Sequence, residues 1–297
     1  MAHEALAVGE VLWDLLPEGR RLGGAPGNFA YHCRCLGADS RLVTRVGDDA
    51  LDREVLRRFR DLGLPVEAVQ VDADRPTGTA EVAIDAGGQP RYTIIEDVAW
   101  DRIEATDVAL RLAARADAVC FGTLAQRSET SRRSIRSLVV AAKPGAIRLL
   151  DVNFRPPFVD AAIVAESLDL ADALKLNDEE LPALAAMLGL PDGVREPMAE
   201  LAHRYRLSLV ALTRGAQGSL LLADGEWSDA PGIHAQVVDN VGAGDAFTAA
   251  LVVGWLAGRP LDEINARANE VAAYVCSQPG GTPPLPPSLR YPDEARP

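Results

Sequence analysis

The feature that most constrains the fold is an alternation of short apolar runs and longer helical segments from residue 101 onward. Runs such as 118–122 and 147–151 have the length of buried strands, and segments such as 128–142 have helical spacing. Strands that alternate with helices form parallel sheets with helices on both faces. We therefore predict an α/β fold with a doubly wound parallel sheet, in a single domain over residues 1–297.

The N-terminal third interrupts this rhythm with a predicted β-hairpin. Residues 79–85 and 91–95 alternate apolar and polar side chains and are joined by Ala-Gly-Gly-Gln. Together with residues 10–22, the segment 78–98 predicts a small sheet that projects from the main body and could act as a lid. Its exposed face invites pairing with a second copy of the chain, so a homodimer through this sheet is a candidate assembly.

Composition narrows the classes of partner. The net charge of -13 argues against non-specific binding to nucleic acids and to anionic membranes. No apolar run approaches the ~20 residues of a membrane span, and the N-terminus lacks the basic segment of a signal peptide. We therefore expect a cytoplasmic protein. The four cysteines have no metal-type spacing, so we expect reduced structural thiols.

One stretch carries the strongest chemical signal, Asp239-Asn240-Val241-Gly242-Ala243-Gly244-Asp245. It follows an extended run, 235–238, that we predict to be a strand, and it precedes a predicted helix, 246–258. The first N–H groups of a helix have no internal partner and attract anions. Asp245 places a carboxylate at this positive end. Either it takes a proton from an attacking hydroxyl while the amides hold a phosphoryl group, or it only caps the helix.

Further polar clusters follow the other predicted strands. They are Gly122–Gln126, Asp151–Arg155, Asn177–Glu180 and Thr213–Gly218. In doubly wound sheets, ligands bind beyond the carboxyl ends of the strands, so the clusters favour a shared ligand site. The chain has no Gly-x-x-x-x-Gly-Lys-Ser/Thr motif, which excludes a P-loop enzyme. It also has no Gly-x-Gly-x-x-Gly after the first strand, which disfavours a nicotinamide oxidoreductase.

The ordered set of motifs resembles the ribokinase-like (PfkB-type) carbohydrate kinases. The resemblance rests on Gly23-Gly24-Ala25-Pro26-Gly27-Asn28 near the start and on the 239–245 stretch near the end, with the strand-end clusters between them. It covers essentially the whole chain. The Gly-Gly-Ala-Pro form and the Gly9-Glu10 opening look most like fructokinases.

The resemblance assigns roles to individual residues. Asp245 matches the catalytic base, and the amides of Gly242, Ala243 and Gly244 match the anion hole. The residues that match sugar-binding positions, or could join them, are Asp14, Gly24, Asn28, Gln126 and Arg155. For Arg155, a surface ion pair is the alternative.

The nucleotide side of the site is assigned in the same way. The matching positions are Asn177, Thr213, Gly215, Gly218, Gly244 and Asn269. Glu180 would organise Mg²⁺ through water. The alternative is that Glu180 is an ordinary acidic residue at the start of a helix. The family's monovalent-cation site implies Asp239 and the carbonyl of Val241 as K⁺ ligands. Because Val241 stands where the family often has Thr, K⁺ dependence stays open.

The resemblance implies an ATP-dependent sugar kinase that binds a small sugar, ATP and Mg²⁺ and converts fructose to fructose 6-phosphate. Two alternatives remain at this point. One is a kinase for another sugar, such as 2-keto-3-deoxygluconate or ribose. The other is a non-catalytic sugar- or nucleotide-binding regulator on the same fold.

Overall fold

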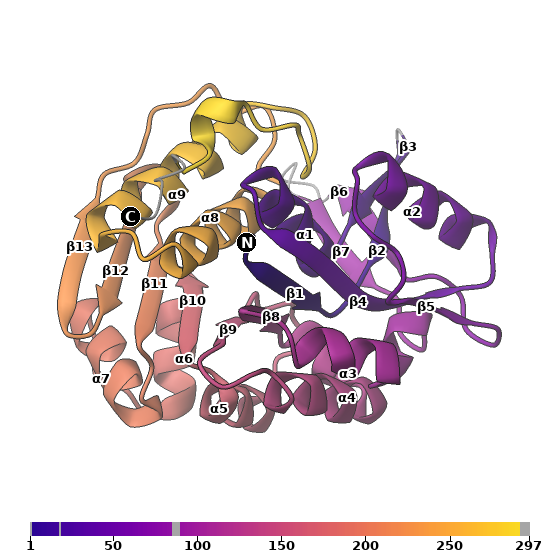
Figure 1. The fold of residues 1–297 in the computed structure, drawn as a ribbon, viewed down its shortest axis with the longest axis horizontal. Helices are drawn as coiled ribbons and strands as arrows, with labels where there is room; N and C mark the ends of the chain where they lie inside the picture. Colours follow the sequence, from indigo (N-terminus) through magenta and orange to yellow (C-terminus); the bar gives the residue numbers. More distant parts are fainter. Residues whose placement is uncertain (1, 18, 85–89, 292–297) are drawn as a thin grey trace.

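The computed structural model describes residues 2–17, 19–84 and 90–291, which fold around two β-sheets (Figure 1). The larger sheet has the strand order β13-β12-β11-β10-β9-β8-β1-β4-β5. Its strands are β1 (Glu4–Val8), β4 (Asp39–Gly47), β5 (Val69–Asp72), β8 (Ala118–Gly122), β9 (Ile147–Asp151), β10 (Ala173–Asn177), β11 (Leu209–Thr213), β12 (Ser219–Ala223) and β13 (Glu226–Ala230). All pairings from β5 to β11 are parallel, which confirms the prediction, and β12 and β13 add an antiparallel edge.

Helices cover both faces of the large sheet (Figure 1). One face carries α1 (Ala25–Cys35), α2 (Ala50–Asp61), α8 (Ala243–Leu256) and α9 (Leu261–Cys276). The other carries α3 (Asp107–Ala113), α4 (Glu129–Val140), α5 (Ala161–Leu170), α6 (Glu180–Leu188) and α7 (Arg195–Tyr205). Alternate residues of each central strand face the two layers, so both faces are apolar. None of the helices in the described parts of the chain is long and apolar enough to cross a membrane.

Helix α8 is central to the packing. Every residue from Ala246 to Gly254 is buried, because α8 packs against α1 and α9 as well as the sheet (Figure 1). A helix that is apolar all round belongs inside the core, where it is held rigidly. It begins at Ala243, three residues before the predicted start, so the glycine turn forms its cap and first turn.

The small sheet has the order β3-β2-β6-β7. Its strands are β2 (Leu12–Leu16), β3 (Gly19–Gly23), β6 (Thr79–Ile84) and β7 (Pro90–Ile94). The predicted sheet is therefore present, while its predicted Ala-Gly-Gly-Gln turn at residues 86–89 lies outside the described residues. Trp13 of β2 is fully buried and donates a hydrogen bond from Nε1 to the carbonyl of Leu51, and Arg20 of β3 pairs with Glu54, so this sheet is attached to α2.

The prediction of a strand at 235–238 is wrong. This segment is a loop, and Val237 and Val238 are each 60% exposed. The strand that pairs with β12 is β13, reached through Asp224 and Gly225, whose φ angles are 49° and 85°. Positive φ at both central residues is the geometry of a tight hairpin turn, for which Asp-Gly is a strong sequence signal. That signal had been overlooked.

Candidate active site

The site is built around the N-terminus of α8. Gly242 caps the helix with φ of 77°, and a Cβ at this position would lie 2.4 Å from the carbonyl oxygen of Gly281. Only glycine fits here, because the turn packs directly on the backbone of a second loop. The first intrahelical bond runs from the N–H of Ala246 to the carbonyl of Gly242 at 2.8 Å. The N–H groups of the first turn are therefore available to an anion.

This turn opens onto a cleft of about 540 Å³ between the two sheets. One wall lies at the carboxyl ends of β1, β9, β10 and β11, and the other is formed by the small sheet. The ten residues that were predicted for the site and line this cleft are Asp14, Gly24, Asn28, Arg155, Asn177, Thr213, Val241, Gly242, Gly244 and Asp245. The fold therefore brings together segments that are far apart in the sequence.

Asp245 is the half-buried acid at the base of the cleft. Its Oδ2 accepts a hydrogen bond from Nδ2 of Asn28 at 2.8 Å. Burial, together with repulsion from Asp151, raises the pKa of Asp245 to about 6, against the lowering effects of Asn28, Lys175 and Arg155. A carboxylate with this pKa is ionised at neutral pH and can accept a proton from a hydroxyl.

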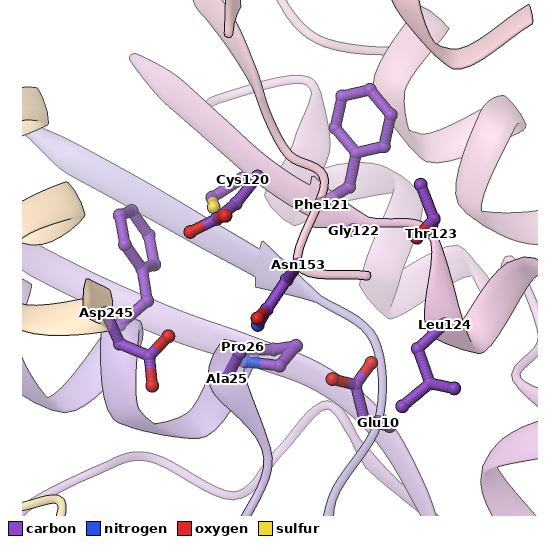
Figure 2. Close-up of a pocket in the computed structure, with 12 residues that line it drawn as sticks. Glu10, Ala25, Pro26, Cys120, Phe121, Gly122, Thr123, Leu124, Asn153 and Asp245 are labelled. Atoms are coloured by element: carbon purple, nitrogen blue, oxygen red, sulfur yellow. The ribbon is translucent and has the colours of Figure 1, made fainter. Parts of the chain in front are cut away.

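A smaller pocket of about 20 Å³ adjoins the cleft, large enough for a water molecule. In Figure 2 the carboxyl groups of Asp245 and Glu10 both point into this space, from α8 and from the end of β1, near the side-chain amide of Asn153. Burial raises the pKa of Glu10, and Arg155 partly offsets this rise. The floor of the site thus holds one buried acid, Glu10, and one half-buried acid, Asp245, beside an amide.

Four of the five residues predicted to hold a sugar line the cleft, all except Gln126. Asp14 projects from β2 into the cleft, and burial raises its pKa, against the opposing charges of Arg155 and Arg21. Gly24 has φ of 114°, and a Cβ there would lie 2.6 Å from the carbonyl oxygen of Glu10. Glycine at position 24 therefore lets α1 begin against the end of β1, which brings Asn28 to Asp245.

Gln126 is an exception and corrects the prediction. Its Nε2 donates to the carbonyl of Gly122 at 2.8 Å and to Oγ of Ser167 at 2.9 Å. The side chain is fully buried and turned toward α5, and it is not among the residues that line the cleft. Gln126 therefore connects the loop after β8 to α5 and does not face the sugar side.

The predicted nucleotide residues separate into two groups. Asn177 and Thr213 are neighbours in register at the ends of β10 and β11 and line the cleft. Gly215, in the turn after β11, has open space around it, whereas Gly218 packs so tightly that a Cβ would lie 2.1 Å from the carbonyl oxygen of Ala230. Neither lines the cleft, so among the predicted nucleotide residues Asn177, Thr213 and Gly244 line it.

Asn269 lies in a buried polar network of α9 and does not line the cleft. Its Nδ2 donates to Oγ of Ser219 at 2.6 Å and to the carbonyl of Asn265 at 2.9 Å. These bonds fix α9 against the antiparallel edge of the sheet. The hydrogen bonds of the Asn269 amide nitrogen therefore stabilise the packing of α9.

Glu180 joins two loops at the edge of the site. Its Oε1 accepts from the N–H of Phe154 at 2.9 Å and its Oε2 from the N–H of Asn177 at 2.8 Å. Burial raises its pKa. Among the described residues there is no cluster of His, Cys, Asp or Glu that could hold a metal by itself. This geometry fits Mg²⁺ only through water, since each carboxylate oxygen keeps a further lone pair.

One of the two predicted K⁺ ligands, Asp239, accepts hydrogen bonds on both of its carboxylate oxygens. Oδ1 of Asp239 accepts from the N–H of Val241 at 3.0 Å, and Oδ2 accepts from Arg21 at 2.9 Å and from the N–H of Gly280 at 3.1 Å. A guanidinium from the small sheet thus already neutralises the carboxylate and would repel a second cation. Sequence alone could not reveal a contact between residues 218 positions apart.

Three functional candidates were missed from the sequence. Glu10, Asn153 and Lys175 all line the cleft, yet none had been assigned a role. Asn153 had a usable signal, since it follows a strand within a polar cluster; its φ of 43° turns the chain sharply at that point. Glu10 lies two residues after the end of β1 and had a similar signal. Lys175 had none, because it stands inside an apolar strand.

Comparisons with known proteins identify the family of this chain. Residues 18–288 match the profile of the pfkB family carbohydrate kinases. The chain is 32% identical over 282 residues to a fructokinase of Klebsiella pneumoniae, covering 91% of this chain and 90% of that protein. The chain therefore belongs to the pfkB family of carbohydrate kinases.

Solved structures show the same fold. The crystal structure of a sugar kinase from Pyrococcus horikoshii in complex with ATP is 27% identical, with a TM-score of 0.81 over 94% of each chain. A fructokinase from Xylella fastidiosa with bound ATP has a TM-score of 0.84, covers 98% of this chain and 95% of that one, and is 21% identical. At that identity it supports the fold alone.

Proposed function

We propose that this carbohydrate kinase transfers the γ-phosphoryl group of ATP to fructose and forms fructose 6-phosphate. The observation that carries the proposal is the half-buried Asp245, hydrogen-bonded to Asn28 at the N-terminus of α8 in a cleft of about 540 Å³. A proton acceptor beside free helix amides is the arrangement that phosphoryl transfer to a hydroxyl requires. The fructokinase of Klebsiella pneumoniae supports fructose as the acceptor, and the ATP complex of the Pyrococcus horikoshii kinase supports ATP as the donor.

The reaction follows from the placement of these groups. Asp14, Asn28 and Arg155 bind the sugar hydroxyls, so that one hydroxyl lies against Asp245. The carboxylate of Asp245 takes the proton as the hydroxyl oxygen bonds to the γ-phosphorus, and the bond from that phosphorus to the β-phosphate oxygen breaks, releasing ADP. The N–H groups of Gly242, Ala243 and Gly244 stabilise the charge on the equatorial oxygens.

The nucleotide lies toward β10 and β11 in this proposal. Asn177 and Thr213 face its phosphates, and the turn of Gly215 and Gly218 follows from the end of β11. Mg²⁺ neutralises the phosphate charge when bound. Asn177 and Glu180 would hold it through water. In this proposal the small sheet closes over the sugar as a lid.

The sugar specificity is tested by measuring ATP consumption across a panel that includes fructose, ribose and 2-keto-3-deoxygluconate. We expect the largest kcat/KM with fructose, and no consumption above background when sugar is omitted. A higher kcat/KM with another sugar would replace fructose as the substrate. Absence of turnover with every sugar would overturn the assignment as a kinase and leave a binding protein on this fold.

Replacing K⁺ by Na⁺ in the assay should leave kcat unchanged. The physical reason is that Arg21 already neutralises Asp239 beside the anion-hole turn. Arg21→Gln removes that charge, so this variant should lose activity and regain part of it when K⁺ is added. Arg20→Gln is the matched control, since Arg20 is on the same strand but pairs with Glu54 of α2. Strong K⁺ activation of the natural protein would contradict the assigned role of Arg21.

A further inference from the structure

Lys175 is a buried cation in the middle of the site. The chain has only two lysines, Lys143 and Lys175, although it has 30 basic residues. Lys143 pairs with Asp117 at the surface. Lys175 lies in β10 with 5% of its surface exposed, and its remaining exposure is toward the cleft, which it lines. A buried ammonium is costly, so its contacts point to a reason for its presence.

A chain of polar contacts connects Lys175 to the start of α8. Its Nζ donates to Oδ1 of Asp151 at 3.2 Å, and Oδ2 of Asp151 lies 3.1 Å from Oγ1 of Thr248. Thr248 is on α8 and lies 2.9 Å from the carbonyl oxygen of Gly244. A Cβ built on Gly244 would be 3.3 Å from Nζ of Lys175. The ammonium therefore lies directly beside the anion-hole turn.

The ammonium also has donors to spare. Lysine has three N–H donors, and within the described parts of the chain Asp151 is its single hydrogen-bond acceptor. Burial lowers the pKa of Lys175, but attraction to Asp151, Glu180 and Asp245 outweighs this effect and leaves the pKa above its ordinary value. Lys175 is therefore charged at neutral pH, with donors directed at the space where an anion would meet the α8 amides.

We propose that Lys175 binds the phosphoryl group while it passes from ATP to the sugar, and that Asp151 and Thr248 hold Lys175 in place for this purpose. The inference rests on the proposed kinase function and deepens it. In the step, the sugar oxygen bonds to phosphorus, the proton moves to Asp245, and ADP leaves with the electron pair of the broken bond. Lys175 stays protonated throughout and offsets the negative charge of the equatorial oxygens.

The alternative is that Lys175 only neutralises Asp151. The two roles predict different values of kcat when the charges of Lys175 and Asp151 are both removed. If Lys175 only compensates Asp151, the double variant Lys175→Met/Asp151→Leu should keep the natural kcat, because well-packed apolar residues can replace a buried ion pair without loss of stability. If Lys175 binds the phosphoryl group, the double variant should fold but have a much lower kcat than the natural protein.

The experiment compares the natural protein, Lys175→Met, the double variant and Lys143→Met with the sugar that the natural protein turns over. We expect kcat to fall by roughly 10²–10³-fold in both variants that lack Lys175, the range for loss of one transition-state donor, with KM for the sugar little changed. Lys143→Met should match the natural protein. Thermal melting identifies any variant that fails to fold. If Lys175→Met fails to fold, the double variant still tests the role of Lys175.

Two readouts separate this inference from the proposed function. Removing the Lys175 charge alone, in Lys175→Met, should move the acid limb of the pH profile to higher pH, because an attraction that lowers the pKa of Asp245 is lost while the repulsion from Asp151 remains. Calorimetric binding of ADP with aluminium fluoride and sugar should weaken in the double variant, while ADP alone binds as before. Natural kcat in the double variant would overturn the role of Lys175, whereas absence of turnover in the natural protein would overturn the kinase itself.

Discussion

Asp245→Asn should lower kcat by roughly 10²–10⁴-fold, the range for loss of a general base, with KM for the sugar nearly unchanged. The amide has the size of the carboxylate and keeps a side-chain oxygen facing Asn28, but it cannot take the proton of the attacking hydroxyl. Steady-state kinetics and calorimetric sugar binding measure the two effects separately. Asp262→Asn is the matched control, because Asp262 lies in the first turn of α9, away from the cleft, and accepts a hydrogen bond from Ser228.

The pH profile gives an independent measure of the same group. Asp245 accepts a proton only when ionised, and its pKa of about 6 lies above the ordinary aspartate value. The value of kcat/KM should therefore fall as the pH drops through about 6. Asn28→Ala removes the hydrogen bond that lowers this pKa, so the midpoint should move to higher pH. Full activity of Asp245→Asn, or a midpoint near the ordinary ~4 in both proteins, would reduce Asp245 to a helix cap.

The parts of the site that could be predicted from the sequence are those set by local order along the chain. Asp245, Gly242 and Asn28 all lie in a turn that opens a helix or in the first turn of that helix, and such a turn places backbone amides and one side chain at the same edge of a sheet. The strands Ala118–Gly122 and Ile147–Asp151 are predicted for a similar reason, since short apolar runs of this length are typical of buried strands.

The remaining parts depend on contacts that local sequence does not encode. Lys175 stands between Leu174 and Leu176 in a strand whose two faces are both buried, so alternation could not say that it faces α8. Gln126 was expected at the sugar, but the short helical turn that carries it rotates its amide toward Ser167. The pairing of Arg21 with Asp239 depends on how the small sheet is placed against the body.

Gly242→Ala should lower kcat by roughly 10²–10³-fold, the range for loss of an anion-hole donor. The added Cβ would lie 2.4 Å from the carbonyl oxygen and 2.6 Å from the Cα of Gly281, and both are backbone atoms. The turn or the facing loop must therefore shift, which moves the N–H groups of Ala243 and Gly244 away from the phosphoryl group. The free energy of unfolding should also fall by about 1–3 kcal/mol, as in other overpacked cores.

Gly258→Ala is the control for this prediction, at the opposite end of the same helix. Gly258 also has positive φ, 65°, but a Cβ there has no heavy atom within 4 Å. It should cost about 1–2 kcal/mol of stability from the backbone conformation alone and leave kcat unchanged. Denaturant unfolding and kinetics of both variants separate stability from catalysis. If Gly242→Ala lost stability but kept its kcat, the α8 amides would not be the groups that stabilise the transferring phosphoryl group. Lys175 and Mg²⁺ would then have to stabilise its negative charge.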